Sequence, residues 1–126
     1  MFSPIVDEMR FFRRAEKQAA PSAEQAVITH LPISGDDFGT EDEREAVYAL
    51  EKRIESAVAE IGGEHDGNEF GGGEAVLYTY GPDADAVFEA IRGCFEDFPI
   101  RPGAYAVKRF GAADDPAARE ERVSLA

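Results

Sequence analysis

The densest group of side chains that could do chemistry in this 126-residue chain lies between Gly62 and Gly81. Within residues 62–74, six polar or charged residues stand among six glycines: Glu64, His65, Asp66, Asn68, Glu69 and Glu74. Carboxylate and amide oxygens on a flexible backbone are the ligands that hard cations such as Ca²⁺ prefer. The segment is therefore a candidate site for a divalent cation or a small ligand, with Tyr78 or Tyr80 of the adjoining apolar run lining it.

No established metal or phosphate motif accompanies these residues. The spacing is not that of an EF-hand, and one cysteine with two distant histidines makes no zinc pattern. The run Gly71–Gly73 leads into an expected strand and not into a helix, which argues against a phosphate cradle. The structural alternative is a bent hairpin whose glycines permit a bulge and whose carboxylates point to water. The sequence thus assigns no metal ligand and no cofactor.

Acid–base catalysis would fall to His30 or His65. His30 stands near the end of an expected strand, where a structural histidine is the usual finding. His65 adjoins Asp66, but adjacent residues of a strand face opposite ways. Cys94 falls in the apolar stripe of an expected helix and is predicted to be a buried, unreactive thiol. No catalytic residue is assigned, and an enzyme is the least favoured interpretation.

Two amphipathic helices are expected to flank the segment. The capping box Thr40-Glu41-Asp42-Glu43 and apolar residues at steps of three and four predict a helix over 41–61, ended by Gly62 and Gly63. The pattern places Glu51, Glu55 and Glu60 on the solvent-facing side of this helix. A second helix, capped by Asp83, carries an apolar stripe from Val87 to Phe98 and ends before Pro99.

Strands are expected over 26–33, 63–70, 74–80 and 104–110, with a short edge strand at 123–125. Pro32 cannot donate to a β-ladder, so it is placed at a strand end or edge. The turn between the second and third strands is placed at Gly71–Gly73. The alternative is a tighter turn at Asp66-Gly67, which would shift the register.

These elements predict one α+β domain over 26–126, a ferredoxin-like β-α-β-β-α-β plait with both helices on one face of an antiparallel sheet. Residues 1–20 predict a further helix with an apolar stripe and a basic stripe, more in keeping with docking on the domain than with binding a membrane. The other face of the sheet is not polar enough to face water. Either the helix over 1–20 or a second subunit, in a homodimer, is expected to cover it.

The formal net charge is −13, and residues 21–126 hold nine basic and twenty-three acidic side chains. Such a charge repels nucleic acid and anionic membranes, and it favours a basic protein partner or a cation. Lys108 and Arg109 with nearby tyrosines do not make a nucleic-acid platform, because a basic surround is missing. A single cysteine, no apolar run near 18 residues and no signal-peptide pattern predict a soluble cytoplasmic protein.

The run DGNEFGGGEAVLYTYGPDADAVF (66–88) followed by GAYAVKRFG (103–111) resembles a family of small bacterial proteins of uncharacterised activity, over about 38–123. A more distant similarity is to the RNase E inhibitor protein B group of small, acidic, ferredoxin-like regulators, and it is confined to architecture, acidity and a short Asp-Gly element. The resemblance brings no activity and no functional residue. The acidic charge of residues 21–126, and not the resemblance, favours a binding or regulatory module, for which a basic protein is the expected partner.

Overall fold

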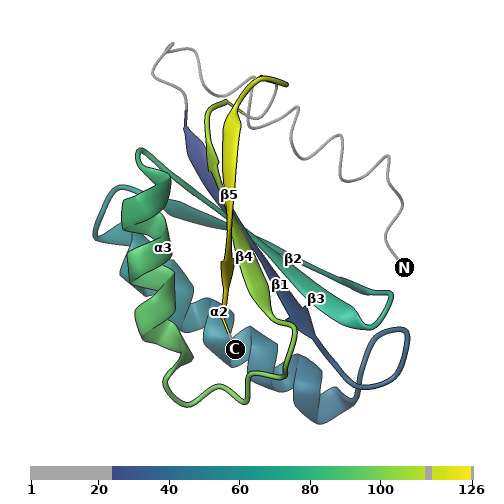
Figure 1. The fold of residues 1–126 in the computed structure, drawn as a ribbon. Coiled ribbons are helices and arrows are strands. Elements are labelled where there is room, and N and C mark those ends of the chain that lie inside the picture. The colour runs from purple at the N-terminus through teal and green to yellow at the C-terminus, as the bar shows by residue number, and fades with distance from the viewer. Residues whose placement is uncertain (1–23, 113–114, 126) are drawn as a thin grey trace.

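The computed structural model describes residues 24–112 and 115–125 (Figure 1). The helix expected over 1–20 lies outside the described residues. The described elements, in chain order, are β1 Gln25–Pro32, α2 Glu41–Ala59, β2 Glu64–Gly71, β3 Glu74–Gly81, α3 Ala84–Arg92, a 3₁₀ turn Gly93–Phe95, β4 Tyr105–Phe110 and β5 Arg119–Ser124.

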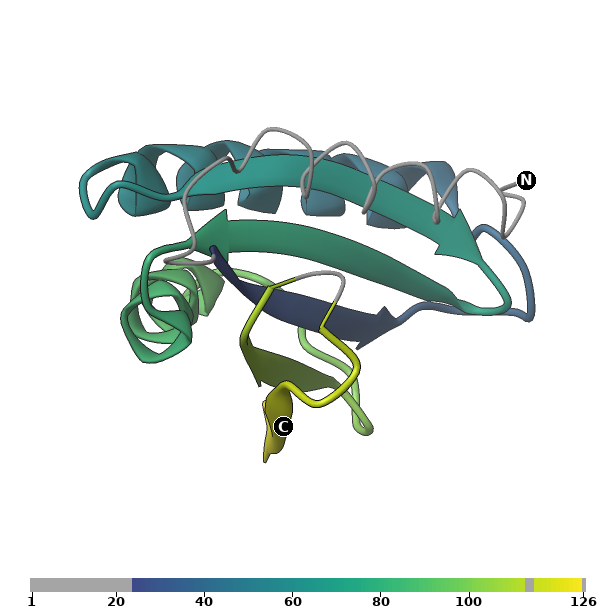
Figure 2. The ribbon, with the colours of Figure 1, turned by 90° about the horizontal axis from the view of Figure 1, so that it is seen from above.

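The strands form one antiparallel sheet in the order β2-β3-β1-β4-β5. Figure 2 shows them side by side in this order. Helices α2 and α3 share one hydrophobic core with β1, β3 and β4, so both lie on the same face of the sheet (Figure 1). The expected α+β architecture, with an antiparallel sheet and two helices, is confirmed.

The core forms because the apolar residues of α2 recur once per turn and meet alternate residues of the strands. Val47, Leu50, Ile54 and Val58 are fully buried along α2. Leu77 of β3 is fully buried too, and replacing such a leucine or isoleucine by alanine costs about 2–5 kcal/mol. This face of the sheet is held rigidly against the helices.

Both helix starts follow the prediction. Thr40 accepts a hydrogen bond from the Glu43 amide at 3.1 Å, and the Glu43 carboxylate accepts from the Thr40 amide at 2.8 Å. Asp83 caps α3 by accepting from the Asp85 amide. The end of α3 is earlier than predicted. The α-helix stops at Arg92 and tightens into the 3₁₀ turn at Gly93, since glycine is a poor helix former.

The β2–β3 hairpin turns at Gly72 and Gly73, which have φ of 61° and 81°. Gly73 is needed for space as well, because a Cβ there would lie 2.9 Å from the Gly35 carbonyl oxygen. The placement of the turn at Gly71–Gly73 is confirmed, and the alternative turn at Asp66-Gly67 is wrong. Asp66 is instead the extra residue of a β-bulge, and Gly67 after it has φ of 133°.

The edge strand β5 is longer than predicted. It pairs with β4 over six residues, from Arg119 opposite Phe110 to Ser124 opposite Tyr105. Ion pairs join the two strands: Arg109 Nη1 lies 2.9 Å from Glu120 Oε2, and Lys108 Nζ lies 2.7 Å from Glu121 Oε1. The same Lys108 also lies 2.9 Å from Asp85 of α3. Its hydrogen bond to Glu121, and to a smaller extent the one to Asp85, raises the pKa of Lys108.

Candidate functional site

The bulge at Asp66 distributes the predicted site residues over both faces of the sheet. Before it, Glu64 pairs with Tyr80 and His65 with Thr79. After it, Gly67 pairs with Tyr78 and Asn68 with Leu77. Directly paired residues point to the same face. Consequently His65 and Asn68 face the helices, while Glu64, Glu69, Tyr78 and Tyr80 share the other face, which we call the second face.

On the helix face, four side chains form a polar network between α2 and the hairpin. His65 Nε2 lies 2.6 Å from Glu51 Oε2, and His65 Nδ1 lies 3.0 Å from Thr79 Oγ1. Asn68 Nδ2 donates to Glu51 Oε1 at 2.6 Å. The His65 and Glu51 side chains are only 5% and 12% exposed. The assignment of Glu51 to the solvent-facing side is therefore wrong: it turns toward β2, where two buried donors need its carboxylate.

The order hydroxyl, imidazole, carboxylate is the one that nucleophilic catalysis uses. A carboxylate only accepts, so Nε2–H of His65 donates to Glu51, and Nδ1 on the other side of the ring faces the Thr79 hydroxyl. Thr79, however, is fully buried beneath α2. A substrate carbonyl has no route to that hydroxyl, so the network is a structural clamp between helix and hairpin.

On the second face, Glu69 stands out because it is a carboxylate with only 9% exposure. Its Oε1 accepts from the Tyr78 hydroxyl at 2.8 Å. Its Oε2 is buried and accepts no hydrogen bond from any residue that the structure describes. Burying an ionised carboxylate oxygen without a hydrogen-bond donor destabilises the folded state. Of the predicted site residues, Glu69 is therefore the one that an added donor or cation would stabilise most.

The remaining candidates lie apart from this pair. Glu74 begins β3 and its Oε1 lies 3.3 Å from His30 Nδ1. The His30 ring stacks on Tyr105 with centroids 4.5 Å apart, which agrees with a structural role for this histidine. Within 24–112 and 115–125, no three His, Cys, Asp or Glu side chains gather closely enough to hold a metal ion. The hairpin carboxylates therefore do not converge.

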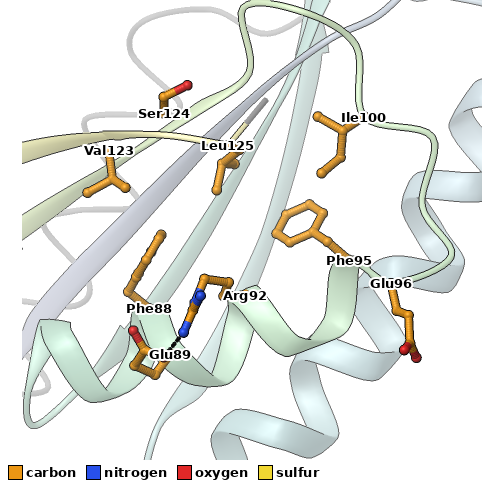
Figure 3. A pocket seen from close by; sticks show the side chains of 9 residues that line it. All are labelled: Phe88, Glu89, Arg92, Phe95, Glu96, Ile100, Val123, Ser124 and Leu125. Carbon is orange, nitrogen blue, oxygen red and sulfur yellow. Dashed lines mark hydrogen bonds and ion pairs between the residues drawn. The ribbon is translucent and has the colours of Figure 1, made fainter.

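Two hollows of the described structure lie away from the hairpin. A groove of about 610 Å³ opens between α3 and β5, lined by Phe88, Phe95, Ile100, Val123 and Leu125 (Figure 3). The ion pair of Glu89 and Arg92, 2.5 Å apart, stands at its rim. A smaller hollow of about 110 Å³ lies near Pro32, Phe98 and Arg101. No local pattern in the sequence predicts the groove, because the groove depends on how far β5 extends.

Cys94 is 8% exposed and its Sγ lies 3.4 Å from the Ala90 carbonyl oxygen. Burial raises the pKa of its thiol, so the thiolate that a nucleophile needs is disfavoured. The prediction of a buried thiol is confirmed.

The predicted site residues do not include two aromatic residues that the structure exposes to solvent. Phe38 is 36% exposed and Tyr48 is 46% exposed, and they are the large hydrophobic side chains that the described surface shows to solvent. The Tyr48 ring meets Phe70 edge to face, with centroids 5.8 Å apart. Arg44, one helical turn before Tyr48, donates to the carbonyl oxygens of Phe38 and Gly39 at 3.3 and 2.9 Å. We use the name aromatic patch for the Tyr48–Phe70 ring pair together with Phe38, whose loop Arg44 joins to α2.

The aromatic patch adjoins the most acidic stretch of the chain. Residues 36–45 hold six acidic side chains and one basic one. The loop before α2 is fixed to the hairpin turn, because Gly73 accepts from the Ile33 amide at 2.9 Å and donates to the Asp37 carbonyl oxygen at 3.0 Å. The Ser34 hydroxyl, the Thr40 and Ser34 amides and the charge of Arg101 lower the pKa of Glu43 from 4.5 to about 2. Glu43 is therefore charged throughout the physiological range.

In the described part of the chain, no helix is long and apolar enough to cross a membrane. No protein-family model, no curated protein and no solved structure matches this chain.

Proposed function

We propose that this protein is a binding module that holds a basic segment of a partner protein against the aromatic patch. One observation carries the proposal. Phe38 and Tyr48, the exposed large hydrophobic side chains of the described surface, lie within and three residues after a stretch with six acidic residues and one basic residue. Aromatic anchors supply most of the binding energy in protein interfaces, and a charged surround selects and steers the partner.

The surroundings of the patch favour binding over a merely solvated surface. The loop at 34–39 is tied to the hairpin turn, and Arg44 is bonded to the loop carbonyls, so little ordering entropy is lost when a partner docks. Five of the six carboxylates are exposed: Asp36, Asp37, Glu41, Asp42 and Glu45. Lysine or arginine side chains of a partner would reach them while its apolar residues cover the rings.

We also propose that the domain is a ferredoxin-like plait with β5 added at one edge. The order β2-β3-β1-β4, with a helix after β1 and after β3, supports this assignment. It is in keeping with the architectural similarity to the RNase E inhibitor protein B regulators. A cytoplasmic regulator that acts by occupying a basic partner is the role we propose on this basis.

The test is capture of partners on the immobilised full chain from a lysate of the source cells, compared between variants. We expect F38A/Y48A to retain at least about tenfold less of any basic partner, because truncated aromatic anchors commonly cost 2 kcal/mol or more. Replacing Glu41, Asp42 and Glu45 by their amides should weaken capture, whereas the same change at Glu55, Glu60 and Glu96 should not.

Salt gives a second readout. Because exposed charges are screened beyond about 10 Å at 0.1 M salt, capture should fall steeply as salt rises toward 1 M. Equal retention by the wild type and F38A/Y48A, or binding that is indifferent to salt, would overturn the proposal.

A further inference from the structure

The second face of the sheet has an apolar centre. Ala26 and Ile28 of β1 pair with Tyr80 and Tyr78 of β3, and Ile28 also pairs with Val107 of β4. Ala26, Tyr78 and Tyr80 are buried together, with Ile28 and Val76 packed against them. An antiparallel sheet face of this composition is stable only when something packs on it.

Charge is divided across this face. Glu64 and Glu69 lie on β2, at one side of the apolar centre. Arg109 and Arg122 lie toward the other side, and both are engaged: Arg109 pairs with Glu120, and the Arg122 guanidinium lies 3.6 Å from the centre of the Tyr105 ring. The β2 side therefore offers negative charge to whatever covers the face, and within residues 24–112 and 115–125 the buried Oε2 of Glu69 has no hydrogen-bond donor.

The chain itself contains a segment with the matching chemistry. Residues 1–20 carry an apolar stripe of Ile5, Val6, Met9 and Phe12, and a basic stripe of Arg10, Arg13, Arg14 and Lys17. As a helix, twenty residues would span about 30 Å. The eight-residue strands of the sheet span about 26 Å, so the lengths agree. Residues 21–23 then join the segment to Glu24 and to β1, which is the middle strand.

We propose that residues 1–20 dock on the second face through the apolar stripe, and that a cationic side chain of the basic stripe pairs with Glu69. The division of charge sets the orientation: the basic stripe is directed toward β2 and away from Arg109 and Arg122. This inference uses a different surface from the aromatic patch and does not depend on the proposed function.

Tryptic cleavage of the full chain under native conditions tests the docking. Trypsin cuts after Arg10, Arg13, Arg14 and Lys17 only when these residues are undocked, so the cleavage rate reports the undocked population. We expect cleavage in the wild type to be at least about tenfold slower than in a synthetic 1–20 peptide. E69Q should raise the rate at these sites about tenfold, because it removes a charge-assisted bond.

Glu55→Gln is the matched control, since it removes an exposed carboxylate on the helix α2, and its cleavage rate should equal that of the wild type. If E69Q fails to fold, as judged by circular dichroism, Val107→Asp tests the apolar half of the proposal and should also raise the rate. Cleavage of the wild type as fast as the peptide, or equal rates in E69Q and E55Q, would refute the docking. A concentration-dependent dimer in sedimentation that dissociates with E69Q would assign the face to a second copy instead.

Discussion

A single extra residue, Asp66, decides what the hairpin can do. Residue alternation alone would place Glu64, Asp66 and Asn68 on one face of β2 and His65 and Glu69 on the other. The bulge reverses this phase after Asp66, so that His65 and Asn68 both reach Glu51 on α2. The residue types at 62–74 could be read from the sequence, but their faces could not. The position of a bulge depends on which register gives the buried donors their partners.

Glu43 shows how several weak contacts add up at one carboxylate. Because its folded-state pKa is lowered from 4.5 to about 2, the stability it contributes is present above pH 4.5 and is lost as the pH falls through about 2. We expect the wild type to be more stable than Glu43→Gln at pH 7. The difference should shrink between about pH 4.5 and about pH 2.

Urea unfolding of both proteins across this pH range measures the difference. Glu45→Gln is the control, because Glu45 is exposed in the same helical turn and should show little difference at any pH. A Glu43 difference that stays constant down to pH 2, or that grows on acidification, would contradict the lowered pKa.

At the scale of elements, local signals predicted α2 well and β5 poorly. Helix α2 has a capping box and an apolar residue in every turn, so its observed span Glu41–Ala59 falls within the predicted 41–61. Strand β5 begins with four charged residues, Arg119 to Arg122, which show no apolar alternation. It is held as a strand by its backbone pairing with β4 over six residues, with ion pairs from Lys108 and Arg109 to its glutamates in addition. Such contacts join distant parts of the chain and leave no local pattern.

The polar network between α2 and the hairpin should contribute more to the free energy of unfolding than an ordinary surface contact does. Replacing Glu51 by alanine leaves His65 and Asn68 without their acceptor in a largely buried position. We expect Glu51→Ala to lower the free energy of unfolding by roughly 3 kcal/mol at pH 7, as measured in urea.

Glu55→Ala, one turn further along the exposed side of α2, is the matched control and should change stability by no more than about 0.5 kcal/mol. Equal losses for the two variants would show that the clamp contributes nothing beyond helix propensity.

For the whole molecule, the net charge of −13 could be read from composition, but its distribution could not. The hairpin carboxylates were expected to offer a cation site. The structure separates the polar side chains of the hairpin: Glu64 and Glu69 lie on the second face, His65 and Asn68 are bonded to Glu51 of α2, and Glu74 is paired with His30. The most acidic stretch lies instead at 36–45, beside the aromatic patch. This distribution is in keeping with the binding surface that we propose and not with a cation site at the hairpin.

This distribution predicts how the protein responds to cations. A ligand that binds the native state raises Tm with a saturating dependence on its concentration. We expect Ca²⁺ and Mn²⁺ to raise Tm no more than NaCl does at the same ionic strength, because each acts only by screening the repulsion among carboxylates. The matched NaCl series is the control. A saturating rise with either divalent ion beyond that series, abolished by E69Q and kept in Glu55→Gln, would instead place a cation at the hairpin and revive the alternative that its sequence suggests.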